Sequence, residues 1–342
     1  MSTMFQAKLL DWYQANHRKL PWRENHNPYY IWLSEVMLQQ TQVATVIDYF
    51  NRFIEAYPSV EALAQADEDH VLKLWEGLGY YSRARRLIPC ARMVVEDFDG
   101  QFPQTYKDLL ALPGVGSYTA GAIGSIAFNK KYPAVDGNVM RVYSRLFVMS
   151  HDLSQAKSKK AFEDKVLETL PEDRRHFNQA LMELGATICS PKSPKCDQCP
   201  LVVDCQAYQA GRVEDLPVKT KKIKKKTLMM AVCQVVYEDL WMVEKRGDQG
   251  LLAGMWGFPA YSYDKDPIKA IQEGLKDNYG LEPLDFDVIK EGKHVFTHRI
   301  WHMTLYRVRV KKRVDTDLPM NQWIRPEDIQ DYPLPTAFKK LL

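Results

Sequence analysis

The sequence has few cysteines, little net charge and no long apolar run, and each absence excludes a class of protein. Six cysteines in 342 residues are too few for a disulfide-based scaffold. A formal net charge of +3 is too small to indicate a nucleic-acid partner, so basic groups must be considered locally. No apolar run approaches the ~18 residues that a membrane span requires.

The amino terminus shows no targeting segment. Residues 1–14, MSTMFQAKLLDWYQ, lack the charged and then apolar pattern of a signal peptide. We therefore expect a soluble, cytoplasmic protein, nucleoid-associated and bacterial-like. The sequence contains no coiled-coil heptads, so we expect a monomer.

The length and a change of pattern near residue 219 predict two domains. Strand-like alternation is scarce up to about residue 210, where amphipathic helical segments cover residues 29–49, 60–74 and 159–170. Further on, strand-like runs at 228–237, 240–244 and 302–310 surround a helical stretch at 268–279. We expect a mainly α domain over residues 1–218 and an α+β domain over 228–342.

A lysine-rich linker is predicted between the two domains, over residues 219–227. Residues 219–226 read KTKKIKKK, and like-charge repulsion keeps such a run solvated and extended. It can be a plain solubilising linker, or it can add a salt-dependent contact with DNA phosphates. Both interpretations stay open.

The most informative segment is LPGVGSYTAG at residues 112–121, followed by VDGNVMR at 135–141. Pro113 ends a helical run, and the bare amides of Gly114 and Gly116 can meet a phosphate before a second helix begins. This predicts a helix-hairpin-helix over about residues 106–128. Asp136 lies in a short loop where its carboxylate can face a ligand. An ordinary helical hairpin with a capping Asp136 is the alternative.

Four of the cysteines form a C-x6-C-x2-C-x5-C cluster, which predicts a metal site in the loop over residues 189–205: Cys189, Cys196, Cys199 and Cys205. Structural zinc and an iron–sulfur cluster both accept four thiolates. Only one C-x2-C pair occurs and the other spacings are longer, which favours iron and sulfur. Cys90 and Cys233 are isolated in apolar settings and are interpreted as small core residues.

With these motifs in this order, the chain resembles the endonuclease III superfamily of DNA glycosylases over roughly residues 5–215. It is most similar to adenine DNA glycosylases of the MutY type, because of SEVMLQQTQV at residues 34–43 and the second domain. The resemblance implies a two-lobed helical fold and a [4Fe-4S] cluster at the four cysteines. It also implies removal of adenine mispaired with 8-oxoguanine, and with guanine, from double-stranded DNA in base excision repair.

Cleavage of a purine N-glycosidic bond requires a proton donor at the base and an anion near the sugar. The resemblance gives the first role to Glu35, which protonates adenine N7 and later helps activate water, and the second to Asp136. An apolar setting would keep Glu35 protonated, and its sequence neighbours are apolar: Trp32, Val36 and Met37. A surface glutamate paired with a cation is the alternative for Glu35.

Tyr118 bears on the type of reaction. Lyase-competent relatives have a lysine at this place, which attacks the sugar through a Schiff base. The resemblance therefore implies a monofunctional glycosylase, in which the Tyr118 hydroxyl bonds Asp136 or the sugar. A packed aromatic is the alternative. Asn138 is expected to orient the Asp136 loop or the reacting water.

An enzyme that acts on a base within a duplex must extrude that base. The resemblance implies that Gln40 wedges into the stack, with Thr41 beside it, and that Tyr80 stacks beside the 8-oxoguanine, with Leu78 close by. The extruded adenine is expected to lie among Arg18, Leu20, Trp22, Arg23, Val43 and Gln179.

The second domain resembles the Nudix fold. Its segment GMWGFP at residues 254–259 precedes a helix, as in that family. A Nudix hydrolase needs clustered glutamates to hold magnesium, but the acidic pair is replaced here by Lys276, Asp277 and Asn278. The metal site is predicted to be absent. Recognition of 8-oxoguanine is expected instead from Phe296, Thr297 and His298. Thr297 stands where the family more often has serine, and a buried structural His298 is the alternative.

Three other functions are less favoured. An endonuclease III-like pyrimidine glycosylase with lyase activity disagrees with Tyr118 and with the second domain. A cluster-bearing DNA-binding or redox-sensing protein would not need both Glu35 and Asp136. A Nudix hydrolase would need the clustered glutamates that this chain does not have.

Overall fold

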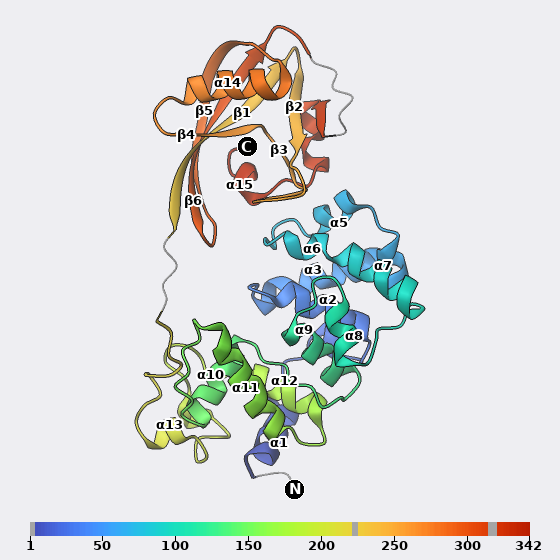
Figure 1. Cartoon of the computed structure of the whole chain (residues 1–342), viewed down its shortest axis with the longest axis vertical. Coiled ribbons are helices and arrows are strands. Elements are labelled where there is room, and N and C mark those ends of the chain that lie inside the picture. The colour runs from blue at the N-terminus through green and yellow to red at the C-terminus, as the bar shows by residue number, and fades with distance from the viewer. Residues whose placement is uncertain (1–3, 221–224, 314–319) are drawn as a thin grey trace. The chain divides into compact units, whose positions relative to one another are not determined.

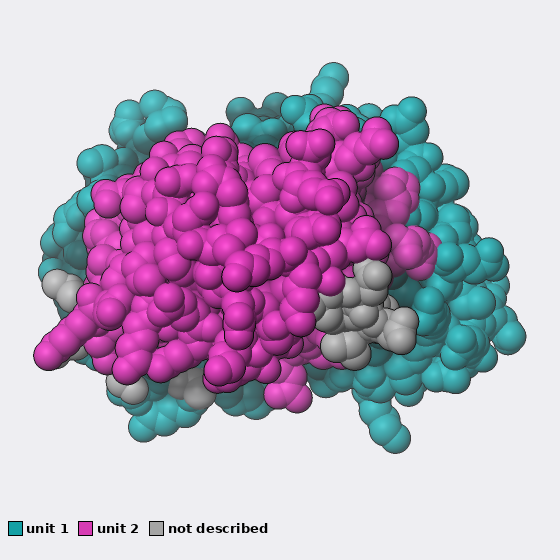
Figure 2. Space-filling model, turned by 90° about the horizontal axis from the view of Figure 1, so that it is seen from above, with its two compact units in different colours: residues 1–65, 86–221 teal, residues 66–85, 222–342 magenta. Residues whose placement is uncertain are grey.

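The computed structural model describes residues 4–220, 225–313 and 320–342. The chain packs into two compact units, which Figure 2 shows in separate colours. The helical unit contains residues 1–65 and 86–221, and the sheet unit contains residues 66–85 and 222–342. The sheet unit thus includes a segment from the amino-terminal half. The domain bounds inferred from the sequence stay a prediction, and residues 221–224 of the predicted linker lie outside the described residues.

The helical unit is built from short helices joined by tight turns (Figure 1). Its described elements are α1 (Met4–Asn16), η1 (Pro21–Arg23), α2 (Pro28–Leu38), α3 (Val43–Ala56), α4 (Val60–Ala64), α7 (Leu87–Phe98), α8 (Tyr106–Ala111), α9 (Ser117–Ala122), η2 (Ile123–Ala127), α10 (Gly137–Leu146), α11 (Ala156–Thr169), α12 (Arg174–Thr187), η3 (Cys196–Gln198) and α13 (Gln206–Gln209).

One core of this unit packs α1, α10, α11 and α12 together. On α10 the apolar side chains recur at helical spacing, at Val139, Val142, Tyr143 and Leu146, and all four are buried. They belong to the same cluster as Phe162 of α11 and Phe177 of α12. This core fixes α10, whose N-cap is Asp136 and whose first turn carries Asn138.

The amphipathic segment over residues 29–49 forms two helices, separated by a turn at Gln40. Helix α2 begins after Asn27, whose side chain accepts a hydrogen bond from the Tyr29 amide, and it ends at Leu38. Gln40 then has φ of 59°, a left-handed conformation that no helix interior tolerates, and α3 begins at Val43. The segment over residues 60–74 is divided in the same way, because Asp67 caps a separate helix α5 (Glu68–Leu74).

The predicted helix-hairpin-helix is present. Helix α8 ends at Ala111, and α9 begins at Ser117 after the glycine turn. The second helix changes to π-helical geometry over η2, a local widening that the sequence did not predict.

The sheet unit is an α+β module, as predicted. Its described elements are α5 (Glu68–Leu74), α6 (Ser82–Arg85), β1 (Lys226–Tyr237), β2 (Leu240–Lys245), β3 (Trp256–Gly257), β4 (Ala260–Tyr263), α14 (Pro267–Tyr279), β5 (Pro283–Val295), β6 (Arg299–Val310), β7 (Asn321–Ile324), η4 (Pro326–Asp331) and α15 (Thr336–Lys339).

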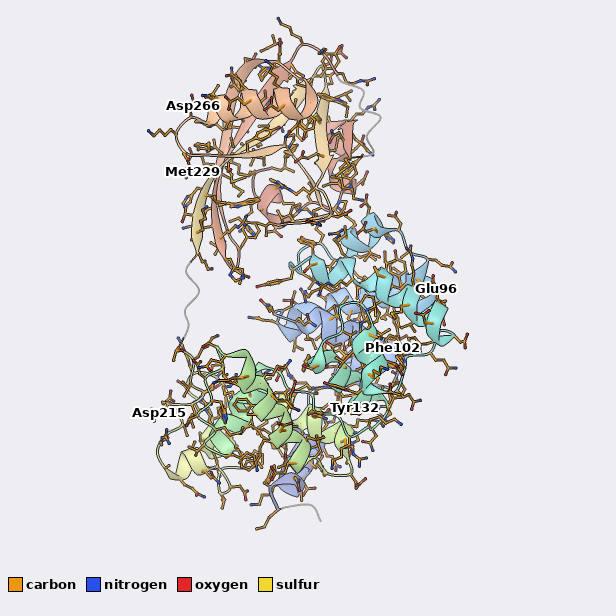
Figure 3. All side chains as sticks on the ribbon, in the orientation of Figure 1. Glu96, Phe102, Tyr132, Asp215, Met229 and Asp266 are labelled. Atoms are coloured by element: carbon orange, nitrogen blue, oxygen red, sulfur yellow. The ribbon has the colours of Figure 1, made fainter. Side chains whose placement is uncertain are left out.

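The described strands form one mixed sheet in the order β3-β2-β1-β6-β5, with β4 paired to β1 and β7 paired to β2. Strands β1 and β6 are parallel, and the other pairs are antiparallel. Successive residues of β1 face opposite sides: Val232 belongs to the cluster around Phe338 of α15, and Cys233 to the cluster around Leu275 of α14. Asp266, labelled in Figure 3, caps α14.

Within residues 4–220, 225–313 and 320–342, no helix has both the length and the apolar character needed to cross a membrane.

Candidate active site

A cavity of about 460 Å³ opens in the helical unit between η1, α2, α9, α10 and α12. This is an ordinary volume for a small-molecule site. The structure brings together at this cavity all the residues predicted for catalysis and for the adenine pocket, together with two of the predicted DNA contacts: Arg18, Leu20, Trp22, Arg23, Glu35, Gln40, Thr41, Val43, Tyr118, Asp136, Asn138 and Gln179.

Glu35 lies on the buried side of α2, with 6% of its surface exposed. The pKa of its carboxyl is raised from 4.5 to about 7, chiefly by burial; the hydrogen bond from Tyr118 opposes the rise and the negative charge of Asp136 adds to it. The alternative interpretation of Glu35, as a surface glutamate paired with a cation, is therefore excluded. Close to neutral pH, this carboxyl can both give and take a proton.

Tyr118 contacts the proposed acid, Glu35, and not the proposed anion, Asp136. Its hydroxyl donates a hydrogen bond to Oε2 of Glu35, which corrects the expectation of a bond to Asp136. Burial and the charges of Glu35 and Asp136 hold the pKa of Tyr118 well above its usual range. The phenol therefore stays neutral and acts as a donor.

Asp136 is the N-cap of α10, and its side chain still lines the cavity. One carboxylate oxygen accepts from the Val139 amide and the other from Nδ2 of Asn138, both at 2.8 Å. Burial raises the pKa of Asp136, and these two hydrogen bonds oppose the rise. The capping and ligand-facing interpretations of Asp136 are thus compatible.

Two glycines allow the backbone to approach the site closely. A Cβ on Gly121 of α9 would lie 2.0 Å from the Pro133 carbonyl oxygen, in the loop that leads to Asp136. A Cβ on Gly185 of α12 would lie 2.6 Å from Cβ of Asn138. Larger residues would push Asp136 and Asn138 away from Glu35.

Glu183 is a site residue that sequence reasoning missed. Its carboxylate, 1% exposed, accepts from Nε of Arg18 at 2.6 Å and from Nη2 of Arg23 at 2.9 Å. Burial opposes its ionisation, but these two arginines hold the pKa of Glu183 below its ordinary value. The only sequence signal was its helical spacing of four from Gln179. Both arginines are therefore engaged with Glu183 as well as lining the cavity.

Arg141 ties the catalytic loop to the start of the cysteine loop. Its Nη2 donates to Oδ1 of Asn138 at 2.7 Å and to the Gly185 carbonyl at 2.8 Å, and its Nε donates to the Cys189 carbonyl at 2.7 Å. With Oδ1 engaged by Arg141, Asn138 is left to donate from Nδ2 to Asp136. The amide orientation of Asn138 is fixed in this way.

The four clustered cysteines line a second, small cavity together with Arg145. Arg145 is 2% exposed, and its Nη1 lies 3.3 Å from Sγ of Cys189 and 2.8 Å from the Ser190 carbonyl oxygen. No set of three or more His, Cys, Asp or Glu side chains in the described part of the chain is arranged to hold a metal ion. A four-thiol pocket with a buried guanidinium suits a negatively charged group.

The hairpin glycines are exposed between α8 and α9, and Gly114 has φ of 80°, which favours glycine. Next to them, Nζ of Lys159 donates to the Ser117 hydroxyl at 2.7 Å. A positive charge therefore lies beside the exposed amides. Gln40 is also exposed, at the turn between α2 and α3.

The residues predicted to recognise 8-oxoguanine lie in the sheet unit. The hydroxyl of Tyr80, a residue 44% exposed, is 3.0 Å from Oγ1 of Thr297, whereas Leu78 is buried. Phe296 packs edge-on against Trp301 with the ring centroids 4.9 Å apart. His298 is exposed, which excludes the buried structural histidine.

Comparison with known proteins agrees with this fold. Residues 33–171 match the family described as HhH-GPD superfamily base excision DNA repair protein, and residues 231–342 match the NUDIX domain. A solved structure described as a thermostable thymine-DNA glycosylase is 31% identical, with a TM-score of 0.55, covering 60% of this chain and 95% of that one. The helical unit is thus that of a helix-hairpin-helix base excision repair protein.

Two curated relatives cover both parts of the chain. The adenine DNA glycosylase of Rattus norvegicus is 35% identical over 99% of this chain and 77% of its own. That of Buchnera aphidicola subsp. Schizaphis graminum (strain Sg) is 33% identical over 99% of this chain and 98% of its own. The chain belongs to the adenine DNA glycosylase family of base excision repair enzymes.

Proposed function

We propose that the protein is a monofunctional glycosylase that removes adenine opposite 8-oxoguanine, and opposite guanine, from double-stranded DNA. The observation that carries the proposal is that Glu35, Tyr118 and Asp136 meet in one cavity, where the pKa of Glu35 is raised to about 7. Such a pair of carboxyls can supply both the acid and the anion that N-glycosidic cleavage requires.

In the proposed mechanism, protonated Glu35 gives its proton to N7 of the extruded adenine. The C1′–N9 bond then breaks with its electron pair moving to the base, and positive charge develops on the sugar. Asp136, held by Asn138 and by the Val139 amide, stabilises that charge. Water adds to C1′ as Glu35, now ionised, takes its proton, which restores the acid.

Hydrolysis without strand cleavage is supported by the side chain beside Glu35. A Schiff base requires an amine, and Tyr118 offers only a neutral phenol. Among the described residues no lysine lines this cavity. The arrangement therefore favours water as the attacking group.

The DNA contacts of the proposal are supported by exposure. The amides of Gly114 and Gly116 are accessible to a phosphate. Gln40 projects at a strained turn next to Thr41, where it can fill the gap left by the extruded adenine. In the sheet unit, Tyr80 and Thr297 are proposed to contact 8-oxoguanine, with Phe296 and His298 flanking them.

We also propose that Cys189, Cys196, Cys199 and Cys205 hold a [4Fe-4S] cluster. The four thiols line one pocket, and the buried guanidinium of Arg145 offsets negative charge there. When bound, the cluster would supply four cross-links to a loop whose only described regular element between residues 189 and 205 is η3.

The test uses duplexes that contain adenine opposite 8-oxoguanine, adenine opposite guanine, or thymine glycol, followed by hot alkali to reveal abasic sites. Alkali-dependent cleavage of the first two duplexes, without borohydride trapping, is expected. Glu35→Gln and Asp136→Asn should abolish base release and keep duplex affinity. Release of thymine glycol with a trapped covalent adduct would instead establish a lyase-type enzyme.

A further inference from the structure

Within the sheet unit, the segment over residues 66–85 is attached to the sheet through acidic side chains. Asp69 of α5 accepts from Nζ of Lys245 at 2.6 Å and from Nε1 of Trp256 at 2.9 Å. Trp256 is 3% exposed and its indole nitrogen is a donor only, so Asp69 satisfies a group that would otherwise lack an acceptor. This contact joins α5 to strands β2 and β3.

A second acidic contact lies seven residues further along, just past the end of α5. Glu76, whose side chain is 11% exposed, accepts from Nζ of Lys339 at 2.6 Å and from the Leu334 amide at 3.0 Å. Lys73 lies 3.2 Å from the same carboxylate and donates to the Tyr332 carbonyl, also at 3.2 Å. We call the contacts of Asp69 and Glu76 the acidic dock.

The acidic dock is linked to the turn that carries Tyr80. Trp75 is fully buried, and its Nε1 donates to the Gly79 carbonyl at 3.1 Å. The guanidinium of Arg83 lies 5.0 Å from the Trp75 ring centroid and donates to the carbonyls of Gly79 at 3.0 Å and Leu78 at 3.3 Å. The turn is thus held by Trp75, which adjoins Glu76 of the dock in the chain, and by Arg83, which packs on Trp75.

Tyr80 needs such support. Its φ is 49°, a conformation that is costly for a residue other than glycine, and its side chain is the exposed end of the turn. Its hydroxyl meets Thr297, which is 217 positions away in the chain. Their distance depends on how α5 and its turn are seated on the sheet.

We propose that Asp69 and Glu76 are positioning residues that place Tyr80 opposite Thr297 and so set the discrimination between 8-oxoguanine and guanine. The inference rests on the proposed function. Neither residue is among those that line the catalytic cavity. Loss of the dock should therefore affect recognition of the opposite base more than cleavage of the adenine bond.

The test compares single-turnover excision of adenine opposite 8-oxoguanine and opposite guanine by the full chain and by Asp69→Asn and Glu76→Gln. The ratio of the two rates should fall about fivefold in each variant, as expected when one charge-assisted contact is weakened. Asp285→Asn is the matched control, because Asp285 pairs with Arg309 at 2.9 Å on an exposed part of the same sheet. Its ratio should be that of the wild type.

A purely structural role would lower both rates together, or lower the melting temperature alone, and leave the ratio unchanged, which would overturn the proposal. A double-mutant cycle gives a second readout for Glu76→Gln. In a Tyr80→Phe background, which lacks the hydroxyl, Glu76→Gln should have no further effect on the ratio; additive effects would also overturn it. If wild-type protein excises adenine from neither duplex, the proposed function itself has failed.

Discussion

Tyr118 donates its hydroxyl hydrogen bond to Oε2 of Glu35, although the two residues are 83 positions apart in the chain. A hydrogen bond to a carboxylate stabilises the ionised form, so this contact opposes the burial that raises the pKa of Glu35 to about 7. The pair therefore sets the pH at which Glu35 holds its proton.

Tyr118→Phe should raise the pKa of Glu35 further, because only the opposing hydrogen bond is removed. The proposed reaction needs protonated Glu35, so the pH at which activity falls should move upward in this variant. Single-turnover excision measured over about pH 5 to 9 checks the shift. Tyr106→Phe is the control, since Tyr106 bonds the Ser117 carbonyl and does not line the cavity. An unchanged or lowered midpoint would contradict the assigned contact.

Glu35→Gln should stabilise the protein at alkaline pH. The pKa of Glu35 rises from 4.5 to about 7 on folding, so its protonated form favours the folded state below pH 4.5, and this contribution is lost as pH rises through 7. The glutamine variant avoids the buried charge, a gain of at most about 3 kcal/mol above pH 8. Urea unfolding at pH 5 and pH 8.5 measures it, and an equal gain at both would refute the linkage.

Substitutions at Asp136 should separate capping from catalysis. Asparagine is as good an N-cap as aspartate, whereas alanine loses the hydrogen bond from the Val139 amide and about 1 kcal/mol of stability. Asp136→Asn and Asp136→Ala should both lose base release, but only the second should unfold at lower urea concentration. Base release by the stable asparagine variant would remove Asp136 from the mechanism.

Glu183→Gln should destabilise the helical unit strongly. The substitution leaves Arg18 and Arg23 beside a neutral amide, and breaking a buried ion pair costs about 3 to 5 kcal/mol. Because Arg18 is 38% exposed, a value at the low end is expected. Denaturation at neutral pH measures the loss. Asp164→Asn, in an exposed pair with Lys160, should cost less than about 0.5 kcal/mol.

The sequence predicted the fold class and the residues around the cavity, because these depend on local motifs and on the resemblance that the motifs carry. The turn at Gln40 was not marked by the helical pattern over residues 29–49. It has no proline or glycine to interrupt the helical pattern, and glutamine is not a residue that favours the left-handed conformation found there. Periodicity could not separate α2 from α3 for that reason.

Long-range pairings were not accessible from one sequence. The buried carboxylate of Glu183 and the attachment of residues 66–85 to the sheet unit both join segments far apart in the chain. Helical spacing says which face a residue occupies and nothing about what that face meets. Tyr118 lines the cavity, but its hydroxyl bonds Glu35 and not Asp136, a pairing that could not be inferred for the same reason.

Cys199→Ser should reduce the iron bound by purified protein and weaken its visible absorbance. Four thiolates are needed to hold the proposed cluster, and a serine hydroxyl is a poor replacement for a sulfur ligand. The loop over residues 189–205 should then be cut faster by trypsin, because it has lysines at positions 192 and 195 and little regular structure.

Cys90→Ala is the matched control: Cys90 is fully buried on α7, outside this loop, so iron content should not change. Equal iron in both variants would show that Cys199 is not a ligand.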